Sequence, residues 1–379
     1  MISHRTLSDG KVGRNITVSL DLPSTPNILL VAGAASWSDW IPDFVNPSDI
    51  NIRVLYEPTH LEQILERIKA EHFDSIVFLS HHATLSEDAS RAEALAQTFA
   101  GQIVAQPHSV ARIAYDKRLM ADLAAQQKWV HPIPELTMSH AENLLGDPEV
   151  AVIIKPRFGT EGVGFRVVET VEELRLLTSA ETDHLIIQPF LQGMEYSLNL
   201  YRTNDNTRCY PIVGKGFNSR QGIHPSKRRR FCPAQTHDAS HDIAMQHAAV
   251  AMAEAMDING VCEFEFIVST AGEIYLVEIN PRVAATMRMA SLAASRSIFD
   301  DFVSASFVAG GGLMPPTANR FAAELPVPSE VSKMFPKGRF AHDLWITSRF
   351  TVVADSEISL AMRIADIDHM VRAALDDIK

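Results

Sequence analysis

Cysteine is scarce in this chain, which has only three among its 379 residues. Cys209, Cys232 and Cys262 are too far apart for the paired spacing of a zinc site or a disulfide framework, and a reduced cytosolic setting is expected. The chain also lacks an uninterrupted apolar run of membrane-spanning length and a signal-peptide core near its start. We therefore expect a soluble, cytoplasmic protein without membrane contacts.

Positive charge is also in deficit, with 34 Lys and Arg against 46 Asp and Glu and a net charge of −12. An acidic surface repels phosphate backbones, which argues against broad nucleic-acid binding and requires a local basic patch for any anionic ligand. Hydrophobic residues at 46% and charged residues at 21% are ordinary globular values, which excludes disordered and fibrous classes. The length predicts two or three domains.

The N-terminal third alternates buried strands with helices. Asn27–Gly33 and Asp74–Leu79 are continuous apolar runs typical of parallel strands, and Gln102–Ala105 predicts a third. The apolar spacing predicts helices over Leu61–His72 and Ser90–Ala100. This order indicates a doubly wound βαβ domain. The segment VAGAASW has no G-x-G-x-x-G, which argues against an NAD-dependent oxidoreductase.

The rest of the chain predicts α+β architecture with antiparallel strands. An Ala-rich helix is expected over Asp116–Gln127, and strand-like segments follow from Ala151 to Asn280. Further helices are expected at Val171–Leu177, Ile243–Met256 and Ser359–Ile378. Residues 1–26 predict a tail or a short hairpin, and Gly310–Pro316 a loop.

A glycine-rich segment, Arg157–Phe165, follows the apolar run that ends in Lys155. The residues after it are strand-like, so the segment is expected at a hairpin tip, where bare backbone N–H groups can close over phosphates. Lys155 would place an ammonium group beside that tip. A merely flexible turn and a solubilising strand-end lysine are the alternatives.

Acidic residues lie on the next predicted hairpin. The segments CEFEFIV and EIYLVEIN flank the turn STAG, so Glu278 and Asn280 share a face and Glu265 can lie opposite them. Two carboxylates and an amide oxygen suit Mg²⁺ carrying substrate phosphates. Glu263 shares that face as a further ligand or a substrate contact. The alternative is a polar outer face of an edge hairpin.

Basic residues concentrate in Ser219–Arg230, which includes Arg228 and Arg230. Such a run often indicates nuclear import or nucleic-acid binding, but its isolation in an acidic chain favours a small anionic ligand. A solvated, silent loop is the alternative. We expect the histidines to be structural or at the surface. His81 keeps some interest because it follows a strand end, where open α/β sheets bind ligands.

In this order, these elements resemble the ATP-grasp superfamily and its carboxylate–amine ligases, over roughly residues 27–310 and most specifically in YLVEINPR. The resemblance implies roles for the following residues. ATP would be bound by Lys117, Lys155, Gly159, Gly162, Gly164, Gln188, Phe190, Leu191 and Glu195; metal by Glu265, Glu278 and Asn280; and acceptor or acyl phosphate oxygens by Arg282, Arg230 and Arg228. Gln188 stands where an acidic residue is frequent, and its amide can still accept from adenine N6.

The resemblance implies an N-terminal βαβ domain (1–108), an ATP-grasp module (109–310, with a lid subdomain at about 130–190) and a C-terminal extension completing the large domain (311–379). It implies a ligase that uses ATP and Mg²⁺, with Mn²⁺ as an alternative, to join a carboxylate to an amine, of the amino acid or dipeptide type. A purine-type or carboxyphosphate ligase and a nucleotide-binding protein without catalysis are the alternatives. The expected partners are small molecules, with a homodimer as the default assembly.

Overall fold

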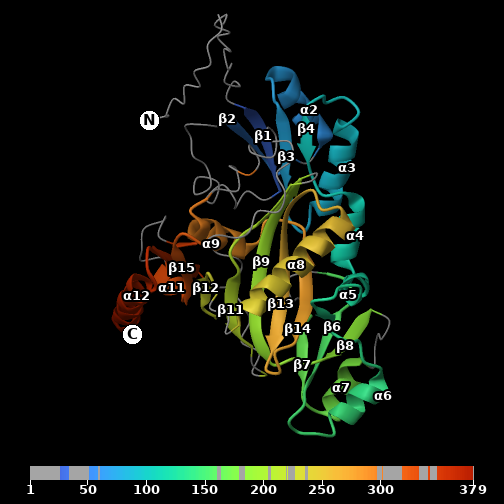
Figure 1. The fold of residues 1–379 in the computed structure, drawn as a ribbon, viewed down its shortest axis with the longest axis vertical. Coiled ribbons are helices and arrows are strands. Elements are labelled where there is room, and N and C mark those ends of the chain that lie inside the picture. Colours follow the sequence, from blue (N-terminus) through green and yellow to red (C-terminus); the bar gives the residue numbers. More distant parts are fainter. Residues whose placement is uncertain are drawn as a thin grey trace, which may run out of the picture.

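The computed structural model describes residues 26–33, 51–58, 60–159, 164–178, 184–203, 206–218, 220, 227–234, 238–296, 301, 318–332, 340–341 and 348–378. Three sheets follow one another along the long axis of the molecule (Figure 1). Residues 1–25, the Gly310–Pro316 loop and Gly162 lie outside the described residues, so the predictions made for them are not addressed by the fold.

The N-terminal unit is a parallel sheet in the order β2-β1-β3-β4. Its strands are β1 (Asn27–Ala32), β2 (Asn51–Tyr56), β3 (Ser75–Leu79) and β4 (Gln102–Val104). Helices α2 (Leu61–Ala70) and α3 (Leu85–Leu95) pack on one face through side chains such as Leu29, Ile76 and Leu95. The predicted parallel sheet of alternating strands and helices is therefore confirmed, with two differences. Strand β2 was not predicted, and α3 begins five residues early, because Glu87 and Asp88 favour a helix start in its first turn.

The predicted Asp116–Gln127 helix is part of a pair, α4 (His108–Tyr115) and α5 (Lys117–Ala125). Asp116 separates them because its backbone is extended. Its side chain accepts a hydrogen bond from the Arg118 backbone N–H at 3.0 Å and so caps α5. This break sets Lys117 at the first position of a helix.

A small antiparallel sheet, in the order β7-β6-β8, forms the lower end of the molecule in Figure 1. It consists of β6 (Val152–Pro156), β7 (Arg166–Val168) and β8 (Leu185–Pro189), with helices α6 (Met138–Leu144) and α7 (Val171–Thr178). Strands β6 and β7 pair antiparallel, which confirms that the glycine-rich segment lies between the strands of a hairpin.

The central sheet has ten strands, in the order β16-β17-β15-β12-β11-β9-β13-β14-β5, with β10 beside β9. Its strands are β5 (His131–Pro132), β9 (Gly193–Thr203), β10 (Asn206–Cys209), β11 (Val213–Phe217), β12 (Arg230–Cys232), β13 (Gly260–Ser269), β14 (Ile274–Asn280), β15 (Phe321–Val327), β16 (Phe340–Ala341) and β17 (Ser348–Ala354). The remaining helices are α8 (Ala239–Met256), α9 (Ala285–Ala294), α11 (Ser329–Ser332) and α12 (Glu357–Ile378).

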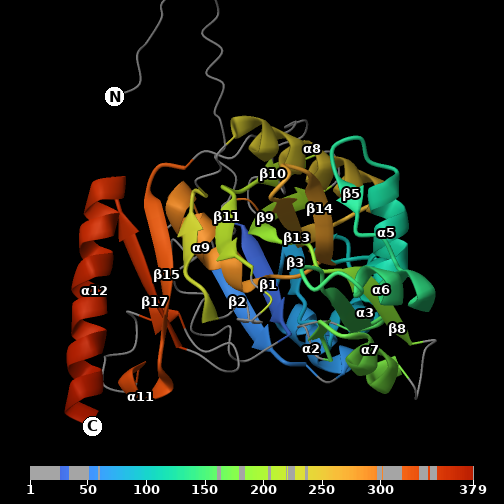
Figure 2. The same cartoon turned by 90° about the horizontal axis from the view of Figure 1, so that it is seen from below.

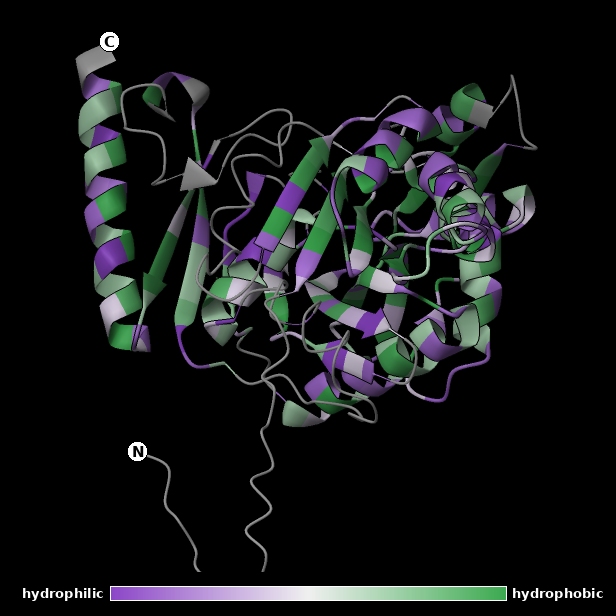
Figure 3. Cartoon of the chain, turned by 90° about the horizontal axis from the view of Figure 1, so that it is seen from above, coloured by the Kyte–Doolittle hydropathy of each residue, from purple (hydrophilic) through white to green (hydrophobic). Residues whose placement is uncertain are grey.

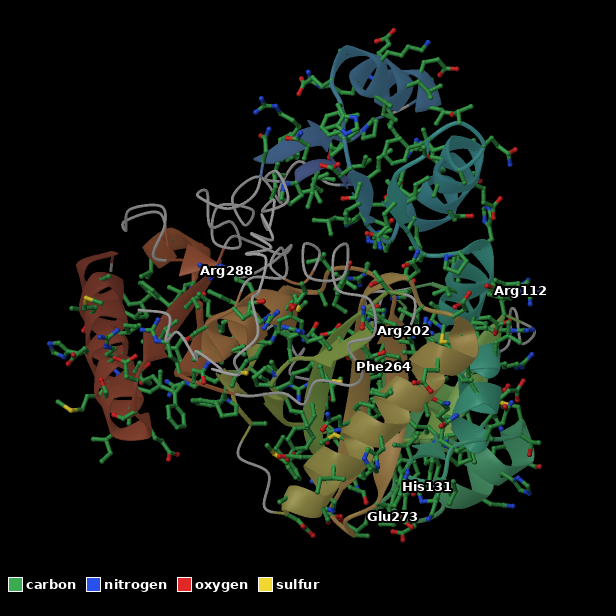
Figure 4. All side chains as sticks on the ribbon, turned by 45° about the horizontal axis from the view of Figure 1, so that its top comes forward. Arg112, His131, Arg202, Phe264, Glu273 and Arg288 are labelled. Carbon is green, nitrogen blue, oxygen red and sulfur yellow. The ribbon has the colours of Figure 1, made fainter. Side chains whose placement is uncertain are left out.

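The two faces of this sheet differ in chemistry, and hydrophilic and hydrophobic residues follow one another along its strands in Figure 3. One face is apolar and carries α8, which covers Leu198 and Phe264 (Figure 4). The other face meets α9 and the N-terminal sheet through Tyr201, Val261 and Met287. Beyond that apolar contact, the same face carries the charged residues described below. Among the described helices, none has the length and apolar character needed to cross a bilayer.

Candidate functional site

Polar side chains gather in two groups on one face of the central sheet. Glu278 on β14 is paired with Glu265 on β13, which is paired with Ser197 on β9. On the far side, Arg230 on β12 is paired with Glu324 on β15. Directly paired residues project from the same face, so one face carries an acidic section at β13–β14 and a charged section beyond it.

Lys215 joins these two sections. It occupies a bulge in β11, between Gly214 and Gly216, and is only 4% exposed. Its Nζ lies 2.6 Å from Glu265 Oε2. Burial opposes the charged form, but the neighbouring carboxylates, with Glu265 foremost, raise the pKa of Lys215 overall. The lysine therefore stays charged within the sheet.

Glu263 and Asn280 form the pair next to Glu265 and Glu278. Glu263 is 3% exposed and accepts hydrogen bonds from Ser197 Oγ at 2.8 Å, Asn280 Nδ2 at 3.1 Å and Thr286 Oγ1. Burial and the nearby Glu265 raise its pKa. Both oxygens of Glu263 are thus engaged inside the protein.

Two lysines approach the acidic section from other elements. Desolvation lowers the pKa of Lys155 to about 8, with a further decrease from Lys117, while Glu278 opposes the shift. Desolvation also lowers the pKa of Lys117, against the attraction of Glu278 and Asp116. The structure thus brings Lys117, Lys155 and Glu278 within electrostatic reach of one another, although they lie on a helix and two different sheets.

A small pocket opens between these lysines. Gln188 contributes the amide group at its wall, and its Nε2 donates to the Ile133 carbonyl at 3.0 Å, which leaves Oε1 as the acceptor. Phe190 and Leu191 do not line this pocket. The lining residues are Lys117, Met120, Ala121, Ile133, Lys155, Gln188, Leu276 and Val277. An apolar wall with one amide and two ammonium groups suits a planar base carrying phosphates.

The base of the glycine-rich segment is fixed to the start of α5. Arg157 donates to both carboxylate oxygens of Asp116, at 2.9 and 2.6 Å, and this bond holds the pKa of Asp116 below its usual range. Lys117 Nζ donates to the Gly159 carbonyl at 2.7 Å. Gly159 and Gly164 have φ values of +113° and +79°, conformations that favour glycine.

The arginines predicted to bind oxyanions lie beside Lys215 and are already ion-paired. Arg228 Nη2 lies 2.6 Å from Glu195 Oε2, and Arg230 Nη1 lies 3.5 Å from Glu324 Oε2. The Nε atoms of both arginines are buried and have no hydrogen-bond partner in the described part of the chain. Arg349 also lies 4.0 Å from Glu324, and desolvation lowers its pKa to about 10. Glu195, predicted to bind ribose, contacts Arg228 instead in this state.

Arg282 lies at the junction with the N-terminal unit. Its Nη2 donates to Asn280 Oδ1 at 3.2 Å. Burial lowers the pKa of His81 to about 4, with smaller contributions from His82 and Arg282, so its imidazole is neutral at pH 7. The strand-end histidine therefore faces the same junction as Arg282.

Lys215, Glu324 and Arg349 also belong to this site, although the sequence did not predict them. Lys215 lies in the short segment VGKGF, where the glycines on either side of the lysine give no local sign that it is buried. Glu324 and Arg349 could be placed only by strand pairing. Among the described residues, no group of three or more His, Cys, Asp or Glu is arranged to hold a metal ion. The predicted metal ligands are two carboxylates and one amide oxygen, and the remaining ligands would be oxygens of a bound substrate.

Comparison with known proteins gives one consistent result. Residues 114–286 match the family model described as an ATP-grasp domain. The carbamoyl phosphate synthase large chain of Thermoplasma acidophilum is 23% identical over 325 residues, covering 82% of this chain and 30% of the relative. The arginine-specific large chain of Lactiplantibacillus plantarum is 26% identical over 315 residues, with 78% and 30% covered. This chain therefore spans under a third of the length of these relatives.

Solved structures share the fold at low identity. An L-amino acid ligase from Bacillus licheniformis has a TM-score of 0.63 at 13% identity, with 91% of this chain and 97% of the ligase covered. N5-carboxyaminoimidazole synthetase from Staphylococcus aureus, complexed with ADP, has a TM-score of 0.63 at 14% identity, with 92% and 98% covered. These similarities establish the architecture and leave the substrates open.

Proposed function

Because residues 114–286 of this chain are an ATP-grasp domain, we propose that the protein uses ATP to activate a carboxylate and joins it to an amine. The observation that carries this proposal is the contact between the acidic and basic sections on one face of the central sheet. The paired carboxylates of Glu265 and Glu278 lie beside a basic section that begins at Lys215, whose Nζ is 2.6 Å from Glu265 Oε2. This face of the sheet thus offers carboxylate oxygens that can bind a cation and, beside them, positively charged side chains that can bind an anion.

ATP would enter the pocket between Lys117 and Lys155. The adenine would lie against the apolar wall with its N6 donating to Gln188 Oε1, and the ammonium groups would contact phosphate oxygens. The glycine-rich hairpin would close over the phosphates and exclude water, which otherwise hydrolyses an acyl phosphate. Gly159 and Gly164, together with Gly162, would supply the backbone N–H groups. Phe190, Leu191 and Glu195 would contact the nucleotide only after a change from the described state.

The donor set of the acidic section fits Mg²⁺ or Mn²⁺. Glu265, Glu278 and Asn280 offer oxygen ligands, which hard divalent cations prefer. The side chain of Glu265 is 21% exposed, so it remains accessible beside its contact with Lys215. A cation held by these residues would neutralise charge on the phosphates.

The proposed reaction has two balanced steps. A substrate carboxylate oxygen attacks the γ-phosphorus of ATP, and the bond to the β-phosphate oxygen breaks to release ADP. An amine then attacks the acyl carbon, phosphate leaves with the bonding electrons, and the amine proton passes to phosphate or water. Arg282, together with Arg228 and Arg230, would hold the acyl phosphate or the acceptor carboxylate through charge-assisted hydrogen bonds.

The excess of cations in the basic section favours an anionic substrate group. Lys215, Arg228, Arg230 and Arg349 lie there, and among the described residues Arg228 is paired with Glu195, while Arg230 and Arg349 share Glu324. An amino acid offers such a carboxylate. We therefore favour an amino acid or dipeptide-type ligase acting on small molecules in the cytoplasm, with a homodimer as its assembly.

The test is ADP and phosphate release from MgATP with pairs of amino acids, followed by mass spectrometry of the product. Release that depends on two amino acids, with a product of their combined mass less one water, supports the proposal. Bicarbonate-stimulated release would favour carboxyphosphate chemistry, the reaction class suggested by the carbamoyl phosphate synthase relatives. ATP binding without ADP formation under any substrate pair would indicate a nucleotide-binding protein without catalysis.

A further inference from the structure

Glu263 differs from its neighbours in the acidic section. Three donors from three elements converge on its carboxylate, namely Ser197 on β9, Asn280 on β14 and Thr286 in the first turn of α9. Its exposed fraction is 3%, against 21% for the side chain of Glu265. A carboxylate occupied in this way has little capacity left for a metal ion.

The hydrogen bonds of Asn280 define which way its amide faces. Its Nδ2 donates to Glu263 Oε2 at 3.1 Å, and its Oδ1 accepts from Arg282 Nη2 at 3.2 Å. An ionised carboxylate can only accept and a guanidinium can only donate, so the reverse orientation would lose both bonds. Only Oδ1 can coordinate a cation, and this orientation presents it away from Glu263.

We propose that Glu263 is a positioning residue that holds the amide of Asn280 with Oδ1 turned toward the metal-binding side. The proposal rests on the metal site of the proposed function and assigns Glu263 no direct bond to the ion. Hydrogen-bond partners behind a ligand commonly change metal affinity by about 10- to 100-fold when they are removed.

The network also ties this ligand to α9. Thr286 Oγ1 donates to Glu263 and accepts from Asn199 Nδ2 at 3.0 Å. Helix α9 packs against the N-terminal sheet through Met287 and Met289. Glu263 therefore connects the β13–β14 hairpin with α9, which lies beside the central sheet (Figure 1).

The experiment measures Mn²⁺ binding by electron paramagnetic resonance in the full chain, with a non-hydrolysable ATP analogue present. In E263L the amide of Asn280 loses its acceptor, so Mn²⁺ affinity should fall by about 10- to 100-fold. In E263Q the new amide oxygen can still accept from Asn280, while its nitrogen donates to the hydroxyls of Ser197 and Thr286, so affinity should stay close to wild type. The matched control S197A removes one donor to Glu263 without touching Asn280 and should also leave affinity unchanged.

A pair of substitutions that exchanges the hydrogen-bond donor and acceptor between positions 263 and 280 provides a sharper test. This test does not require E263L to fold. N280D replaces the donor with a second carboxylate facing Glu263 and should bind Mn²⁺ poorly. Adding E263Q supplies a donor to that carboxylate, so the double variant should recover much of the lost affinity. No recovery, or E263L binding as well as wild type, would overturn the proposal.

The outcomes also separate this proposal from the metal site itself. If E278Q weakens Mn²⁺ binding but the Glu263 variants do not, only the positioning role fails. If E278Q has no effect either, the metal assignment of the proposed function fails. If E263Q loses Mn²⁺ as severely as E278Q, Glu263 is a direct ligand and the positioning role is wrong.

Discussion

Lys215 Nζ lies 2.6 Å from Glu265 Oε2, so a carboxylate proposed as a metal ligand already holds a cation of the protein. The ammonium group is buried, and Glu263 and Glu195 also stabilise its charge. In the absence of a metal ion, this lysine offsets part of the repulsion between the carboxylates of β13 and β14. Metal binding and the lysine contact therefore share one carboxylate.

Removing this cation should destabilise the protein and make it more responsive to metal. K215M leaves Glu265, whose side chain is 21% exposed, without its partner, so the free energy of unfolding should fall by less than the about 3–5 kcal/mol that is typical of a fully buried pair. We expect a lower melting temperature by calorimetry and a larger upward shift on adding MgATP than wild type shows, because the ion replaces the lost charge. The double variant K215M/E265Q removes both charges and should regain part of the stability. An unchanged melting temperature in K215M would contradict the pairing.

Neutralising Glu278 should abolish turnover without unfolding the chain. Its carboxylate raises the pKa of both Lys117 and Lys155 and so favours their charged forms. Glu278 is also paired with Glu265 across the β13–β14 hairpin. In E278Q we expect ADP release to fall on the order of a hundredfold or more, with an unchanged circular dichroism spectrum. The matched control is E273Q, at the outer end of the same hairpin, where Glu273 is exposed and contacts Tyr275 (Figure 4). Full activity in E278Q would disprove the metal assignment.

Local sequence predicted the acidic hairpin well, because the turn STAG places its two strands side by side and a period of two sets the shared face. The glycine-rich hairpin was predictable for the same reason. In contrast, the charged section at β12 and β15 depends on pairing between strands that are far apart in the chain. Arg230 and Glu324 are separated by 94 residues, and no pattern near either one indicates the other.

Strand β2 shows a second reason for a missed element. Its side chains alternate between exposed and half-buried at the edge of the N-terminal sheet, so NIRVLY lacks the continuous apolar run that identified β1 and β3. Lys215 was missed because a lysine between two glycines in a short strand predicts a surface turn. Only the bulge in β11 turns it into the sheet.

Loosening the base of the glycine-rich hairpin should weaken ATP binding. In D116A, Arg157 loses both of its bonds to the start of α5, and the contact of Lys117 with Gly159 loses its support. We expect the dissociation constant for ATP, measured by calorimetry, to rise by about tenfold, which corresponds to about 1.4 kcal/mol of binding free energy.

The neighbouring pair Arg118–Glu135 supplies a matched control for D116A. These side chains also bond at 2.6 Å, but both are more than a third exposed. An exposed pair contributes less than about 1 kcal/mol, so E135Q should leave ATP affinity nearly unchanged. Equal losses in both variants would show that the effect of D116A is general and not specific to the hairpin.

The depressed pKa of Lys155 predicts weaker nucleotide binding in alkaline solution. Its pKa is lowered from 10.5 to about 8, chiefly by desolvation, so the ammonium loses its proton as pH rises through 8. The dissociation constant for ATP should therefore increase above that pH, and the K155M variant should lack this dependence. Between about 8 and 10.5 the unfolded chain binds more protons at this lysine than the folded protein. The contribution of Lys155 to folding stability should consequently rise with pH in that window, opposite in direction to ATP affinity. Affinity that stays constant from pH 7 to 9.5 in the wild type would remove Lys155 from the phosphate site.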